Sequence, residues 1–126
     1  MKTVAAFLNS QGGTLLIGVD DEDKVLGLEQ TDYQSFGAQG KLSDSWSKHW
    51  DSVLRNYLGD AAHTLVTCEL VKLEQGTVAL VHVAKPSPKP VWLTNKSKGD
   101  AEELYIRRMA STVELKGKEL EKYLKG

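Results

Sequence analysis

The chain has 126 residues, of which 40% are hydrophobic and 26% are charged, the ordinary balance of one globular domain. Its single cysteine excludes an intramolecular disulfide, and no stretch approaches the ~20 apolar residues that a membrane-spanning helix needs. No secretory signal is visible, so we expect a cytoplasmic protein that makes no membrane contact.

Charge is distributed unevenly along the chain. The formal net charge is −1, which argues against a strongly basic nucleic-acid-binding protein. Residues 1–84 hold 6 Lys/Arg and 11 Asp/Glu, whereas residues 85–126 hold 10 and 6. The basic C-terminal third could therefore face a polyanion, and an ordinary mixed surface is the alternative.

The N-terminal residues predict a helix, a glycine turn and a strand in direct succession. Apolar residues in 2–8 have helical spacing, and Asn9 closes that helix. Gly12 and Gly13 can adopt the positive φ that turns the chain sharply. The apolar run over residues 14–19 then has the length of a buried strand.

An acidic cluster ends this strand. Asp20, Asp21 and the two acidic residues after them are too charged for a sheet interior, and Gly27 interrupts a short strand expected at residues 25–28. The cluster lacks the glycine and the final glutamate that a calcium loop requires. We therefore interpret it as a solvated turn and expect no metal site.

A loop and a helix follow. Residues 29–40 are polar and predict a loop with at most one helical turn, whereas residues 43–58 show clear helical spacing that Gly59 ends. Trp46 and Trp50 are four residues apart in this helix. They could form a base-stacking platform, but the continuing apolar stripe favours the core face of an amphipathic helix.

A hairpin is expected next. Residues 63–74 and 77–84 alternate as strands and are joined at residues 75–76. Both faces of the second strand are largely apolar, so it should be a central strand. His82 on that strand is expected to be a hydrogen-bonded histidine and not a metal ligand.

The C-terminal third begins with a stiff segment. Three prolines within residues 85–90 force an extended connection from which Lys85 and Lys89 project. The remaining expected elements are a short strand at residues 91–94, a loop at 95–101, a strand at 103–108 and a helix at 116–125. These elements predict one α/β (α+β) domain over residues 1–126, with a mixed, mostly antiparallel sheet and about three helices.

Three separated motifs resemble the Schlafen AlbA-type family. They are AFLNSQGG running into TLLIGVDD and VLGLE, then AKPSPKPVWL, and then ELYIRRMASTVEL, in the family's order and rough spacing over residues 2–115. The resemblance implies a DNA-binding domain of a larger bacterial-type transcriptional regulator or ATPase-like protein. It also implies an upstream strand with a glutamate, which this chain lacks. Relatives usually have Gly after the arginine pair, where this chain has Met109 and Ala110.

The family has also been labelled ATP-binding. Gly13 and Gly18 are five residues apart as in a P-loop, but Val19 and Asp20 stand where Lys and Ser/Thr are needed. A helix also precedes the strand here, so its negative C-terminal end meets the glycines. We expect no P-loop nucleotide site and no cofactor, while a nucleotide site of another geometry stays open.

An enzymatic alternative follows from the same resemblance. Eukaryotic Schlafen relatives cleave structured RNA with three clustered acidic residues, and only Asp20 or Asp21 matches the third. A lone carboxylate cannot hold the divalent ions of such a reaction, so we expect no catalysis by this chain. The alternatives are a metal-dependent RNA endonuclease completed by upstream glutamates and a protein-interaction module that forms a homodimer.

Binding of nucleic acid, either DNA or RNA with low specificity, is the function that the sequence favours. Arginine forks and hydroxyls suit phosphate oxygens, and a stiff proline segment limits the entropy lost on docking. Pairing of an arginine with the acidic turn is the alternative role, and the turn itself can explain Asn9, Gly12 and Gly13. The candidate binding residues are Lys85, Lys89, Arg107, Arg108, Ser111 and Thr112, with Lys96 and Lys98 in a nearby loop.

Overall fold

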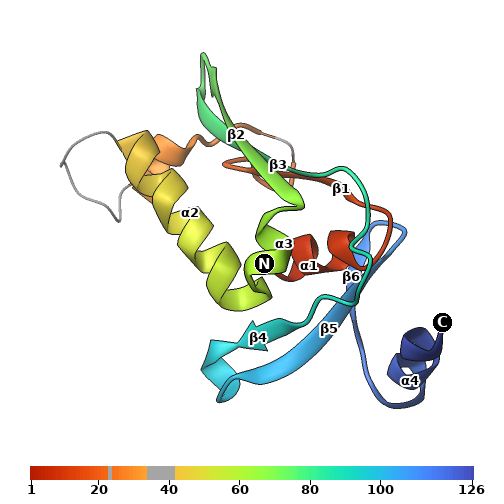
Figure 1. The fold of residues 1–126 in the computed structure, drawn as a ribbon. Helices are drawn as coiled ribbons and strands as arrows, with labels where there is room; N and C mark the ends of the chain where they lie inside the picture. Colours follow the sequence, from red (N-terminus) through yellow and green to blue (C-terminus); the bar gives the residue numbers. More distant parts are fainter. Residues whose placement is uncertain (23, 34–41) are drawn as a thin grey trace.

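The computed structural model describes residues 1–22, 24–33 and 42–126 (Figure 1). The described helices are α1 (Lys2–Leu8), α2 (Leu42–Leu58), α3 (Asp60–His63) and α4 (Gly117–Lys125), with short 3-10 helices η1 (Leu28–Gln30) and η3 (Lys96–Lys98). The described strands are β1 (Gly13–Ile17), β2 (Val66–Leu73), β3 (Gly76–Val83), β4 (Leu93–Asn95), β5 (Ala101–Arg108) and β6 (Ser111–Leu115). The expected α+β class is confirmed, and most of the loop expected at residues 29–40 lies outside the described residues.

The strands form two antiparallel sheets and not the single sheet that was expected. The first has the order β1-β3-β2, so β3 is central, as its two apolar faces predicted. Leu15 of β1 and Cys68 of β2 both lie opposite Val81 of β3. The predicted hairpin is confirmed, with its turn at residues 74–75 instead of 75–76, because Gly76 already pairs with Leu73. Strand β2 begins at Val66, because the chain leaves Gly59 at φ 89° and forms α3 before it extends.

The second sheet has the order β4-β5-β6 and contains a strand that the sequence did not predict. Arg108 pairs with Ser111 and Leu104 with Leu115, so β5 and β6 form a hairpin with a two-residue turn. Met109 makes this turn at a positive φ of 55° with its side chain fully exposed. Because tight hairpin turns are normally marked by Gly, Asn or Asp, this one carried no sequence signal.

The expected short strand at residues 25–28 is also different. It is reduced to a single β-bridge between Val19 and Val25, and the chain then enters η1. The acidic turn is closed by the side chain of Asp20, whose Oδ1 accepts hydrogen bonds from the backbone N–H groups of Glu22 (2.9 Å) and Lys24 (2.8 Å). A turn is therefore confirmed, while the strand after it is too short to continue the sheet.

Helix α1 lies between the two sheets and forms the centre of the core (Figure 1). Residues 4–8 are all buried, and Val4, Ala5, Ala6 and Leu8 are completely inaccessible. A seven-residue helix is too short to be stable by itself, so burial on all sides must hold it. On α2, Trp46 is 3% exposed and stacks on Trp50 with 5.8 Å between ring centroids, which confirms the core interpretation of this pair.

The glycine turn after α1 is confirmed. Gly12 has a φ of 78° and Gly13 a φ of 155°. A Cβ atom on Gly12 would collide with the carbonyl oxygen of Val83 in β3, and one on Gly13 would lie 2.7 Å from the ring of Phe7. Glycine is needed here for space as well as for backbone conformation.

We predict that Gly12→Ala lowers the free energy of unfolding by about 3 kcal/mol, because it adds a backbone collision to the strain of positive φ. Gly99→Ala is the matched control. Gly99 has a φ of 65°, but a Cβ atom there would meet nothing within 4 Å, so its loss should be about 1 kcal/mol. Urea denaturation of both variants measures the difference, and equal losses would contradict the collision.

Candidate nucleic-acid interface

The side chain of Asn9, just after α1, joins three parts of the fold. Asn9 is 8% exposed, and its Nδ2 donates to the carbonyl oxygens of Val91 and Tyr105, both at 2.9 Å. Its Oδ1 accepts a hydrogen bond of 2.7 Å from the backbone N–H of Val91. One buried amide therefore ties the end of α1 both to the residue after the proline segment and to β5.

Backbone and hydroxyl groups beside Asn9 extend this junction. The N–H of Ser87 donates to the carbonyl of Leu8, and the hydroxyl of Tyr123 on α4 donates to the carbonyl of Asn9, each at 2.8 Å. Partial burial raises the pKa of the Tyr123 phenol, which favours the protonated hydroxyl that donates this hydrogen bond. The end of α1 thus positions the proline segment, β5 and α4 relative to one another.

We predict that Asn9→Ala lowers the free energy of unfolding by about 3 kcal/mol, because it leaves two carbonyls and one N–H buried without partners. Asn56→Ala, at an exposed position of α2, should change it by no more than about 0.5 kcal/mol. Chemical denaturation measures both. A loss below about 1 kcal/mol for Asn9→Ala would show that the three hydrogen bonds are easily replaced by water.

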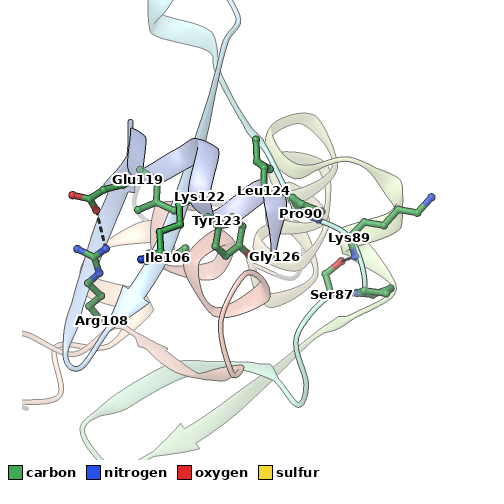
Figure 2. A pocket seen from close by; sticks show the side chains of 12 residues that line it. Ser87, Lys89, Pro90, Ile106, Arg108, Glu119, Lys122, Tyr123, Leu124 and Gly126 are labelled. Atoms are coloured by element: carbon green, nitrogen blue, oxygen red, sulfur yellow. Dashed lines mark hydrogen bonds and ion pairs between the residues drawn. The ribbon is translucent and has the colours of Figure 1, made fainter. Parts of the chain in front are cut away.

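A groove of about 850 Å³ lies between residues 87–90, β5 and α4 (Figure 2). Lys89 and Arg108, two of the predicted binding residues, lie on opposite sides of it with Tyr123 between them (Figure 2). Lys122 of α4 adds a third cationic side chain to the lining. The groove therefore brings together cations from three segments that are distant in the sequence.

Arg108 makes an ion pair inside this groove. Its Nη2 lies 2.8 Å from Oε2 of Glu119 on α4, and both side chains are more than half exposed. The acidic turn was the expected partner if an arginine paired at all, and the observed partner is Glu119 instead. An exposed pair of this kind contributes only about 0 to 1 kcal/mol, so a phosphate can compete for the guanidinium.

Neighbouring residues of a strand face opposite sides, so Arg107 points away from the side that Arg108 occupies and toward α1. Its Nη1 donates to Oγ1 of Thr112 at 2.8 Å, and its guanidinium carbon lies 5.5 Å from the centre of the Phe7 ring. Its backbone N–H donates to Oγ of Ser10 at 2.8 Å. Arg107 and Thr112 thus support each other beside α1 and do not line the groove.

The other predicted binding residues are dispersed. Lys85 and Ser111 are exposed and lie outside the groove lining, as does Lys96, whereas Lys98 lies 3.8 Å from the buried carboxylate of Glu103. Their roles in binding remain predictions. Lys122, Glu119 and Tyr123 line the groove but were not among the predicted binding residues. Their spacing on one amphipathic helix was visible, but the position of α4 depends on strand β6, which was not predicted.

The candidate catalytic residues do not assemble a site among the described residues. Asp20 is partly buried and occupied by its own turn, and Asp21 is exposed. Within residues 1–22, 24–33 and 42–126, no cluster of three or more His, Cys, Asp or Glu side chains could hold a metal ion. None of the helices in these ranges is long and apolar enough to cross a membrane.

The fold and the groove define a small α+β domain whose cationic groove is bordered by a proline segment and a C-terminal helix. The model of the Schlafen AlbA_2 family matches residues 1–116, which is most of the chain, and the chain belongs to this family. The match ends before α4 begins at Gly117. Searches of curated proteins and of solved structures gave no match.

Proposed function

We propose that this domain binds nucleic acid through backbone phosphates and catalyses no reaction itself. Two observations support the proposal. The chain belongs to the Schlafen AlbA_2 family, and resemblance to this family implies DNA binding. Its groove also brings together Lys89, Arg108 and Lys122. The gathering of these cations is the observation that carries the proposal, because an overall net charge of −1 would not attract a polyanion.

The chemistry of these side chains suits phosphate recognition. Arg108 presents a planar fork of donors, while the exposed Lys89 and Lys122 supply mobile point charges. Contacts to phosphates fix position and orientation but read no bases, so we infer low sequence specificity toward DNA or RNA. We further infer that the domain serves a larger bacterial-type transcriptional regulator in the cytoplasm, where reducing conditions suit the exposed free thiol of Cys68.

Arg108→Ala should weaken binding of labelled DNA or RNA about tenfold at low salt, because it removes a charged donor to phosphate. Fluorescence anisotropy with duplex DNA, single-stranded DNA and hairpin RNA across a salt series measures this. Wild-type affinity should fall steeply with salt, and the slope should decrease by about one for the variant.

Arg55→Ala is the matched control for this experiment. Arg55 is also exposed and ion-paired, with Asp51, but it lies on α2, away from α4 (Figure 1). Arg55→Ala removes the same charge as Arg108→Ala but should leave the affinity for nucleic acid nearly unchanged. Equal losses in the two variants would reduce the effect to net charge, and no binding of any probe at low salt would overturn the proposed function.

Glu119→Gln should tighten binding about threefold at low salt, because it releases Arg108 and removes a negative charge from the groove. Glu121→Gln changes the net charge equally. Glu121 pairs with Lys125 on the same helix, 2.8 Å away, and does not line the groove. Anisotropy titrations of both variants separate the local effect from the global one, and an equal gain would contradict competition by Glu119.

A further inference from the structure

We propose that the groove between residues 87–90 and α4 receives a single strand of nucleic acid, with bases against its apolar lining and phosphates at its cationic rims. This inference rests on the proposed function and names the ligand of the same site. It differs from a phosphate-only surface, which would take a duplex equally well.

The lining is more apolar than phosphate binding alone requires. Leu115 is buried beneath the groove, Ile106 and Tyr123 are partly exposed, and Leu124 is 47% exposed. Two exposed proline rings form the opposite wall, at positions 88 and 90. Rigid rings and aliphatic groups offer apolar contact area to the faces of bases, and the fixed proline backbone loses little entropy on binding.

The charges are placed where a strand's phosphates would lie. Lys89 and Arg108 are on opposite sides of Tyr123, and Lys122 projects from α4 (Figure 2). Glu119 is the acidic side chain among the lining residues, and it already pairs with Arg108. Three cationic side chains and one acidic side chain around an apolar centre are complementary to a chain of phosphates that carries bases.

A duplex fits this arrangement poorly. Its base faces are stacked inside the helix, so an apolar wall would meet only sugars, phosphates and groove edges. A single strand can turn its bases outward onto the wall. A volume of about 850 Å³ lies within the range of pockets that enclose small organic groups, which suits a short stretch of one strand.

The helix wall is also available for a ligand. No residue of α4 is buried, and the helix is fastened by the Tyr123 hydroxyl and by the Arg108–Glu119 ion pair. These contacts leave the side chain of Leu124 exposed toward the groove. The α4 wall lies beyond the stretch that matches the family, whereas residues 87–90 and the lining residues of β5 and β6 lie within it.

The test compares an oligothymidylate, a strand of the same length that lacks bases, and a blunt duplex of that length, by anisotropy at one salt concentration. The oligothymidylate should bind about tenfold more tightly than either other probe, because only its bases can lie against the apolar lining. Leu124→Ser should weaken oligothymidylate binding several-fold and leave duplex binding unchanged.

Leu73→Ser is the control for Leu124→Ser, because Leu73 is 43% exposed but lies on β2, outside the groove. Circular dichroism verifies that each variant folds, and Lys122→Ala gives a second variant on the same wall. Equal binding of all three probes, with Arg108→Ala weakening each, would overturn the single-strand inference and leave the proposed function standing. No binding of any probe would overturn both.

Discussion

The buried amide of Asn9 is the interaction on which the rest of the structure depends. Helix α1 has only seven residues and cannot persist without its surroundings, yet it separates the two sheets and supplies the most buried part of the core. Asn9 satisfies three backbone groups at once, two on Val91 after the proline segment and one on Tyr105 of β5. A satisfied buried network of this kind fixes one arrangement, because every alternative leaves polar groups unpaired. The position of the groove is therefore a consequence of how α1 ends.

The elements that could be predicted from sequence are those marked by local patterns. Helical spacing identified α2, alternation identified β3 as a central strand, and the glycine pair identified the turn after α1. Strand β6 was not predicted, because its turn contains Met109 at a positive φ and methionine is not a residue type that indicates such a turn. The division into two sheets was missed for a related reason. This division depends on long-range packing against α1, which local propensity does not indicate.

In the candidate site, too, some residues could be predicted from their chemistry, whereas the position of others depends on long-range contacts. Residue chemistry selected Lys89 and Arg108 for phosphate contact, and both line the groove. Chemistry alone could not separate Arg108 from Arg107, because the two differ only in which face of β5 they occupy. One side faces α4 and solvent; the other faces Phe7 and Thr112. Lys122 and Tyr123 were recognised as helix residues, but their place at the groove follows from the hydrogen bond between Tyr123 and the Asn9 carbonyl, a contact across most of the chain.

Under the proposed function, the charge balance of the domain limits how tightly the groove can bind nucleic acid. With a net charge of −1, the chain offers little long-range attraction, so association must rely on the local field of three cations. Glu119 reduces that field and pairs with Arg108, which makes a phosphate contact at Arg108 an exchange of one anion for another. Exchange of this kind yields modest affinity and fast release. A domain with such a groove gains stable attachment to a long strand mainly when several copies, or other binding modules, act together, because tethering raises the effective concentration without any new contact.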